Sequence, residues 1–323
     1  MTKIHVVSSY MRYGGRVITM LGFADAYAEM GHRVHVFDTG AEPLFYDNET
    51  ILRMHNAPNL SVEHFTGLRY DEDWGYLFDC DMLLLPYPHL VTRFPYKPKC
   101  RVVAWNIAKT PPYDRGLVDD LWTNSYTSKE TLGLRDASVV YAPHSYMVNR
   151  MYSQPWMDRE YDIISVCSVR KRREKEYVIS KELQELQFLH SNGYKVLGLF
   201  MVRDRVEEEY VKHIGFEHHI NIPRRLVACF MGNAKILLHQ SPLESCSLTV
   251  FEALNSGCYP IVREAGACRE QLGDVGYVYS DFYEAFNMIQ FILDTGYDEW
   301  DSIQRGIVFD RRNNRKLYDE VIK

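Results

Sequence analysis

The sequence has few of the features that mark secreted, membrane-spanning or disulfide-stabilised proteins. It has seven cysteines, an odd number, and they form no C-x-x-C pair and no zinc-ligand spacing. This predicts reduced thiols rather than a disulfide framework. No apolar run approaches the roughly 18 residues that a membrane-spanning helix needs. The first apolar stretch, 4–7, is too short for the core of a signal peptide. We therefore expect a cytoplasmic protein, and peripheral contact with a membrane surface stays open.

Positive charge is also in short supply. The chain has 37 Lys and Arg against 43 Asp and Glu, a formal net charge of −6, so no global positive field attracts nucleic acid or anionic lipid. Such a partner would need a local basic patch, and the candidates are 170–173 and 311–316. The hydrophobic share of 46% and charged share of 25% are ordinary for globular proteins and exclude disorder. With 323 residues, the chain is long enough for two domains.

The first half of the chain predicts a doubly wound parallel sheet. A β-branched strand at 3–7 is followed by a turn with Gly14 and Gly15, apolar residues at helical spacing over 17–28, and a second strand at 33–37. This is a βαβ unit, whose parallel strands need a right-handed crossover. Further strands are predicted at 82–85, 102–105, 121–123 and 139–142.

The second half repeats this α/β pattern. Helical or strand periodicity fades over 143–158, a stretch bracketed by prolines, and we place the domain boundary between residues 152 and 153. We expect an N-terminal Rossmann-like domain (1–152) and a C-terminal Rossmann-like domain (153–323) with helices that close the chain. Ligands of open parallel sheets bind beyond the carboxyl ends of the strands. The cleft between the two domains is therefore the predicted site.

The stretch from 238 to 262 carries the most specific pattern. Glu244 lies in the loop after a strand, and Glu252 follows within the next predicted helix, which Ser247 or Thr249 can cap. The N-terminus of that helix offers N–H groups and a positive dipole end, which suit a phosphate. An ionised carboxylate accepts two O–H donors at once, so the two glutamates suit the hydroxyls of a ribose and of a second sugar.

This pattern resembles a known family. Glu244 and Glu252 in E-x7-E spacing, followed by Gly257-Cys258-Tyr259-Pro260, are similar to the signature of retaining glycosyltransferases of family four, which have the GT-B fold. The likeness extends over most of the chain, including Gly14-Gly15 with the stretch 31–34, the stretch 123–125 with 139–144, and the stretch 165–175. The resemblance implies two Rossmann-like domains that face each other across a cleft, an acceptor-side domain over 1–152 and a nucleotide-sugar donor domain over 153–323.

The resemblance also implies roles for residues on the donor side. Glu252 would bind the ribose, and Glu244 the transferred sugar. Arg170 and Lys175 would clamp the leaving diphosphate. The backbone of Ser247, Leu248 and Thr249 would add N–H donors. We count Glu244, Arg170 and Lys175 as candidate catalytic residues.

Two further features belong to the N-terminal half. Gly14 and Gly15 would let the chain approach the donor or acceptor closely, since a Cβ would obstruct it. The histidine that the family carries after a central strand has no counterpart at Trp105 or Asn106, and His89, after the preceding strand, is the candidate substitute.

Together these features predict a metal-independent, retaining glycosyltransferase that uses a nucleotide-diphosphate sugar, with no cofactor and no metal site. The acceptor is expected to be a glycan or lipid-linked saccharide, and nucleic acid stays open through the local basic patch. Two alternatives remain: a nucleotide-sugar 2-epimerase of the same architecture, and a binding module without turnover. The donor base, the sugar, the acceptor and the oligomeric state are not readable from these residues.

Overall fold

The computed structural model describes residues 1–8, 22–24, 26–38, 60–64, 73–85, 88–106, 114–141, 154–168, 176–202, 205–222, 224–242, 244 and 246–298. The chain divides into two compact units, the first comprising the described residues up to 141 and the second those from 154 onward. The predicted boundary between residues 152 and 153 falls outside the described residues. Within the described ranges, no helix is both long enough and apolar enough to cross a bilayer.

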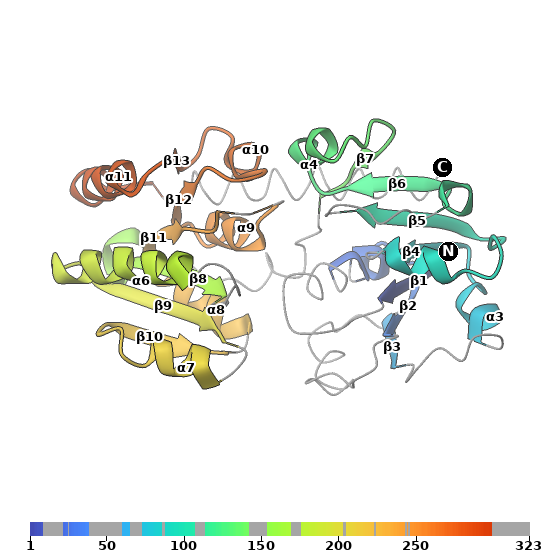
Figure 1. Cartoon of the computed structure of the whole chain (residues 1–323), viewed down its shortest axis with the longest axis horizontal. Coiled ribbons are helices and arrows are strands. Elements are labelled where there is room, and N and C mark those ends of the chain that lie inside the picture. Colours follow the sequence, from blue (N-terminus) through green and yellow to red (C-terminus); the bar gives the residue numbers. More distant parts are fainter. Residues whose placement is uncertain are drawn as a thin grey trace. The chain divides into compact units, whose positions relative to one another are not determined.

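The first unit contains a parallel sheet of seven strands within the described residues (Figure 1). The order is β3-β2-β1-β4-β5-β6-β7. The strands are β1 (Lys3–Ser8), β2 (Arg33–Asp38), β3 (Leu60–His64), β4 (Met82–Leu85), β5 (Arg101–Asn106), β6 (Asp120–Thr123) and β7 (Ser138–Val139). The helical segments are 22–24 with 26–29, α3 (Asp73–Leu77), η1 (Pro88–Arg93), η2 (Arg115–Leu117) and α4 (Tyr126–Thr131).

Continuous apolar runs explain the central strands of this sheet. β4 is buried along its whole length, as expected of a parallel strand with both faces covered. One face packs against Trp74 and Leu77 of α3 and Leu90 of η1. Phe23 is fully buried and stacks edge-on against Trp105 of β5 at 5.2 Å between ring centroids.

The second unit repeats the pattern with six parallel strands in the order β10-β9-β8-β11-β12-β13. These are β8 (Tyr161–Ser168), β9 (Val196–Met201), β10 (Glu217–Ile220), β11 (Ala234–His239), β12 (Tyr259–Arg263) and β13 (Tyr277–Tyr279). The helices are η3 (Trp156–Asp158), α6 (Glu176–Ser191), α7 (Arg205–Val211), α8 (Arg224–Gly232), α9 (Leu248–Asn255), α10 (Cys268–Leu272) and α11 (Phe282–Thr295).

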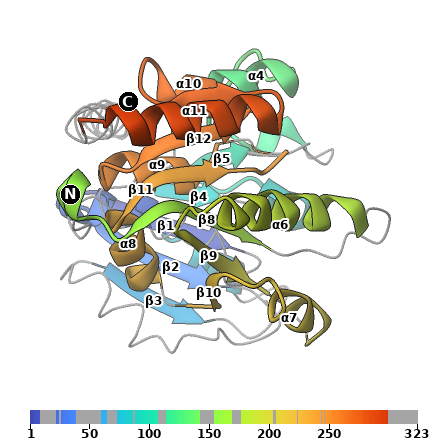
Figure 2. The ribbon, with the colours of Figure 1, turned by 90° about the vertical axis from the view of Figure 1, so that its left-hand side faces the viewer.

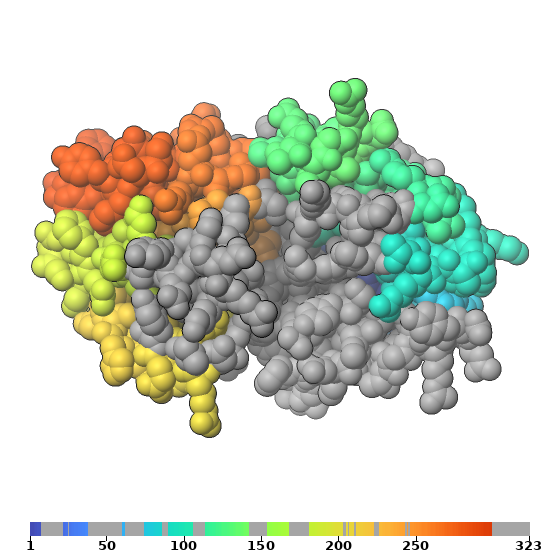
Figure 3. All heavy atoms as spheres, in the orientation of Figure 1, coloured from blue at the N-terminus to red at the C-terminus, as the bar shows by residue number. Residues whose placement is uncertain are grey.

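Helices cover both faces of this sheet, which gives three layers (Figure 2). Ile163, Ile236 and Leu238 point to the face covered by α6, α7 and α11. Their neighbours Ile164 and Leu237 point to the face covered by α8 and α9. The alternation follows from the two-residue period of a strand. The outer sides of α6 and α11 reach the surface of the unit (Figure 3).

Candidate functional site

The site is built where the winding of the second sheet changes direction. β8 lies between β9 and β11, and the chain winds one way from β8 to β10 and the other way from β11 to β13. In open parallel sheets, ligands bind at the carboxyl ends of the strands at such a point. The segment that leaves β11 here runs from His239 through Glu244 to the start of α9.

Helix α9 begins at this edge without a side-chain cap. Ser247 is the N-cap residue, buried and extended (φ −81°, ψ 122°), and its side chain makes no capping hydrogen bond. The first amides of a helix have no intrahelical partner, and together with the dipole they form a positive end. Leu248 and Thr249 are half-buried. The predicted phosphate-binding segment 247–249 is thus the start of a helix.

Gln271 of α10 fixes the position of this start. Its Oε1 accepts a hydrogen bond from the Ser247 N–H at 2.8 Å, and its Nε2 donates to the Ser247 carbonyl oxygen, also at 2.8 Å. Gln271 is fully buried. A buried amide that satisfies a backbone donor and acceptor at once holds the loop in one place.

The two glutamates lie on this segment but are held differently. Glu252 lies within α9 and is only 1% exposed. Glu244 lies on the preceding loop, and its side chain is 26% exposed. Glu244 Oε1 lies 3.6 Å from Nε2 of His239, the last residue of β11. Burial lowers the pKa of His239 to about 4, so the imidazole is neutral at neutral pH.

A chain of buried polar groups supports the end of β11. Ser165 of β8 donates to Gln240 Oε1 at 3.2 Å, and Gln240 Nε2 donates to Glu185 Oε2 of α6 at 2.7 Å. Gln240 Nε2 also lies 3.1 Å from the carbonyl oxygen of Glu182. Burial raises the pKa of Glu185, and the bond from Gln240 opposes that shift. These contacts hold Gln240, and with it the adjacent His239, against two neighbouring elements.

The nearby thiol of Cys246 is not an activated nucleophile. Its pKa is raised well above the ordinary value by burial and by the negative charges of Glu270 and Glu244. Only the thiolate is a good nucleophile, so this cysteine is inert at neutral pH. The position of Cys246 near Glu270 and Glu244 fits a residue of a binding surface better than a nucleophile of covalent catalysis.

The structure brings together five of the residues predicted from the sequence. Glu244, Ser247, Leu248, Thr249 and Glu252 lie along the segment from β11 into α9. His89 lies in η1 of the first unit, where only its backbone is described. The remaining predicted residues, Arg170, Lys175, Gly14 and Gly15, lie outside the described residues.

Sequence reasoning missed the supporting residues. His239 and Gln240 gave a signal, because two polar residues directly follow the apolar run of β11. Gln271 gave none, since it contacts Ser247 from 24 positions away on another helix.

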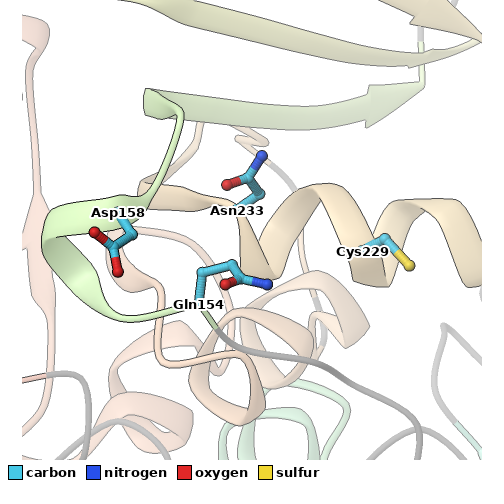
Figure 4. Close-up of a pocket in the computed structure, with 4 residues that line it drawn as sticks. All are labelled: Gln154, Asp158, Cys229 and Asn233. Atoms are coloured by element: carbon cyan, nitrogen blue, oxygen red, sulfur yellow. The ribbon is translucent and has the colours of Figure 1, made fainter.

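A separate pocket lies at the opposite end of the sheet. It has a volume of about 320 Å³ and is lined by Gln154, Asp158, Cys229 and Asn233. Figure 4 shows Gln154 and Asp158 on the segment before β8, Cys229 on α8 and Asn233 directly after that helix. The Tyr161 N–H donates to the Asn233 carbonyl at 3.1 Å where β8 begins. This pocket is therefore at the amino ends of the strands, away from Glu244.

Comparison with solved structures identifies the fold. No protein-family model matches the chain, and no curated protein matches it. HepE of Anabaena, solved in complex with UDP-glucose, superimposes with a TM-score of 0.72 at 14% identity, covering 99% of both chains. The chain has the two-domain, Rossmann-like GT-B fold.

Two further structures with this fold are similar over nearly their full length. The lipopolysaccharide outer core galactosyltransferase WaaB, in its apo form, has a TM-score of 0.67 at 12% identity and covers 100% of this chain and 99% of its own. AviGT4, a glycosyltransferase involved in avilamycin A biosynthesis, has a TM-score of 0.62 at 15% identity and 98% coverage of both chains. The predicted GT-B fold is thereby confirmed.

Proposed function

We propose that this protein is a retaining, metal-independent glycosyltransferase of the family-four type, which transfers a sugar from a nucleotide-diphosphate sugar to an acceptor. One observation carries the proposal. The uncapped start of α9 lies between two carboxylates, Glu244 and Glu252, at the reversal point of a Rossmann-like sheet. That the fold matches HepE, which was solved with UDP-glucose, supports a uridine diphosphate sugar as the first donor to test.

The proposed donor complex follows the polarity of this segment. The diphosphate lies at the N–H groups of Ser247, Leu248 and Thr249, where the helix dipole favours negative charge. Glu252, about one turn into the helix, accepts both ribose hydroxyls. Because Glu252 is buried, water competes little for these hydrogen bonds. Glu244, on the loop, accepts hydroxyls of the transferred sugar.

The reaction needs stabilisation of the leaving group above all. The bond between the sugar C1 and the diphosphate oxygen breaks, an acceptor hydroxyl adds to C1 from the face that the diphosphate leaves, and its proton passes to the departing phosphate. Preorganised donors and cations aimed at that charge lower the barrier, each by about 2.7 to 4 kcal/mol. Arg170 and Lys175 are the proposed cations, and His89 is the proposed counterpart of the family's N-terminal-domain histidine.

We propose a glycan or lipid-linked saccharide as the acceptor. Nucleic acid would have to rely on the stretches 170–173 and 311–316 against a net charge of −6. Neither a cofactor nor a metal ion is part of the proposed reaction, so we expect turnover to be unchanged by a chelator.

A binding panel followed by a turnover assay tests the proposal. UDP, GDP, ADP and their glucose or mannose conjugates are screened by thermal shift, where a ligand at about 100 times its Kd adds about 2.7 kcal/mol of stability. The selected donor is then incubated with and without glycan and lipid-linked acceptors. We expect donor consumption with acceptor-dependent transfer and the anomeric configuration kept.

The other outcomes identify the alternatives. Formation of an epimer without an acceptor would make the protein an epimerase, and tight binding without donor breakdown at long times would make it a binding module. Glu252→Gln should give a clearly smaller thermal shift at the same ligand concentration. Glu264→Gln is the matched control, because Glu264 is an exposed glutamate that pairs with Arg269 at 3.1 Å.

A further inference from the structure

The side chain of His239 is buried, and one of its ring nitrogens has no hydrogen-bond partner among the described residues. The residue is 4% exposed, and its Nε2 makes no hydrogen bond with any of the described residues. A buried polar atom without a partner costs about 1 to 3 kcal/mol. Such an atom at the end of a central strand calls for an explanation.

Among the described residues, Glu244 places a carboxylate oxygen close to this nitrogen. Glu244 Oε1 lies 3.6 Å from His239 Nε2, which exceeds the usual 2.7 to 3.2 Å of an N–H···O bond by less than about 1 Å. Hydrogen bonds of active sites are often long without substrate and shorten in the complex. A small movement of the loop that carries Glu244 closes this gap.

The imidazole is suited to donate to that carboxylate. A neutral imidazole carries one N–H, and a carboxylate only accepts, so the tautomer protonated on Nε2 fits this pair. Burial keeps the ring neutral, with a pKa of about 4. The position of the His239 ring is also fixed, because the adjacent Gln240 is held by Ser165 and Glu185.

We infer that His239 is a positioning residue: in the donor complex its Nε2–H donates to one oxygen of Glu244, which aims the other oxygen at the hydroxyls of the transferred sugar. The inference rests on the proposed function, because it takes Glu244 as the group that holds the sugar. Through Glu244, His239 at the end of β11 would influence which nucleotide sugar binds, although the histidine itself does not touch the substrate.

A binding cycle with two ligands tests the inference. The Kd values of UDP and UDP-glucose are measured by calorimetry for wild type, His239→Leu, His239→Gln, Glu244→Ala and the double variant His239→Leu/Glu244→Ala. We expect His239→Leu to weaken UDP-glucose about tenfold, the equivalent of one hydrogen bond, and to leave UDP unchanged. His239→Gln, whose amide N–H reaches a similar place, should restore most of the affinity. In the Glu244→Ala background, His239→Leu should have no further effect.

The contrary results separate the possible failures. If His239→Leu weakens UDP and UDP-glucose equally, or still acts without Glu244, then His239 only fills space and the inference is overturned. If Glu244→Ala binds UDP-glucose as tightly as wild type does, the role of Glu244 in the proposed function fails, and the inference fails with it. Should His239→Leu not fold, His239→Asn replaces it, because the shorter amide does not reach Glu244.

A matched control excludes a general effect of removing a buried histidine. His5→Leu removes a histidine of the first unit that is 1% exposed and whose Nδ1 lies 2.8 Å from the Leu77 carbonyl oxygen. We expect this variant to bind both ligands as wild type does. A loss of UDP-glucose affinity in His5→Leu as large as in His239→Leu would contradict the specific role of His239.

Discussion

Glu252 and Glu244 differ in burial and in backbone support, and this difference makes their roles separable. Glu252 is part of a helix and 1% exposed, whereas the side chain of Glu244 is 26% exposed on a loop. We expect Glu252→Gln to raise the Kd of UDP about ten- to hundredfold, because a hydrogen bond to a charged group contributes about 1.5 to 3 kcal/mol.

Glu244→Gln should leave the Kd of UDP unchanged and raise the KM for UDP-glucose. Isothermal titration and initial rates measure the two effects. Equal losses of UDP affinity in both variants would show that the carboxylates do not divide the nucleotide and sugar between them.

Gln271 provides a second prediction at the level of single residues. Gln271→Leu removes both partners of the Ser247 backbone and leaves a buried N–H and C=O unpaired, at about 1 to 3 kcal/mol each. We expect a clear loss of stability in urea unfolding and weaker binding of UDP, because the start of α9 is no longer fixed.

Gln187→Leu is the control for that variant. Gln187 makes one partly buried hydrogen bond, from Nε2 to the Ile214 carbonyl at 3.2 Å, away from α9. It should cost less stability and leave UDP affinity intact. If the two variants bind UDP equally well, Gln271 does not position the phosphate-binding segment.

At the level of elements, α9 is also anchored at its far end. The buried guanidinium of Arg159 donates to the carbonyls of Ser256 at 3.0 Å and Gly257 at 2.9 Å, directly after the helix. It also donates to the carbonyls of Ala234 and Gln154, each at 2.8 Å. A cation at the C-terminal end of a helix is favoured by the dipole. The helix that we propose for donor binding is thus held at both ends.

Removing this anchor should destabilise the second unit strongly. Arg159→Met leaves several buried carbonyls without their donor, and we expect a loss on the order of 3 kcal/mol. The urea midpoint measures it. Arg269→Met is the control, since Arg269 forms an exposed pair with Glu264, whose loss costs about 0 to 1 kcal/mol. A similar shift in both variants would contradict the anchoring role.

The strands that carry the site are predictable from sequence, and some of the others are not. The apolar runs of two central strands end with β4 and one residue before the end of β11, because strands buried on both faces need continuous hydrophobic side chains. β3 and β10 were missed. Both are edge strands, and the sequence of β10, Glu-His-His-Ile, has little apolar content. Edge strands pair on one side only, so their sequences carry a weaker signal.

The molecule as a whole repeats one winding pattern, and this explains what sequence reasoning could and could not foresee. Both sheets place their first strand centrally and grow outward on either side, so the reversal point and the loop after β11 follow from chain order alone. The E-x7-E spacing therefore predicts which carboxylates share an edge. The contacts of Gln271, Gln240 and Arg159 join segments far apart in the chain, which no local pattern encodes.

Among the residues whose burial the structure describes, each unit contains one buried histidine, and these two make the stability of the protein depend on pH. Burial lowers the pKa of His5 and of His239 from 6.5 to about 4, and for His5 the hydrogen bond with the Leu77 carbonyl opposes the shift. Between these values the unfolded chain binds protons that the folded chain does not. Stability should therefore fall as the pH drops from 6.5 towards about 4, by about 1.4 kcal/mol per pH unit for each histidine.

Variants of the two histidines show how much each unit contributes to the pH dependence of stability. Urea unfolding is followed at intervals between pH 6.5 and about 4 for wild type, His239→Gln, His5→Leu and the double variant. Each single variant should flatten the slope by one proton, and the double variant by two, whatever its absolute stability. The difference in slope reports each histidine together with the carboxylate that interacts with it, Asp79 for His5 and Glu244 for His239. Slopes that match wild type would mean that these imidazoles take up protons in the folded protein as readily as in the unfolded chain.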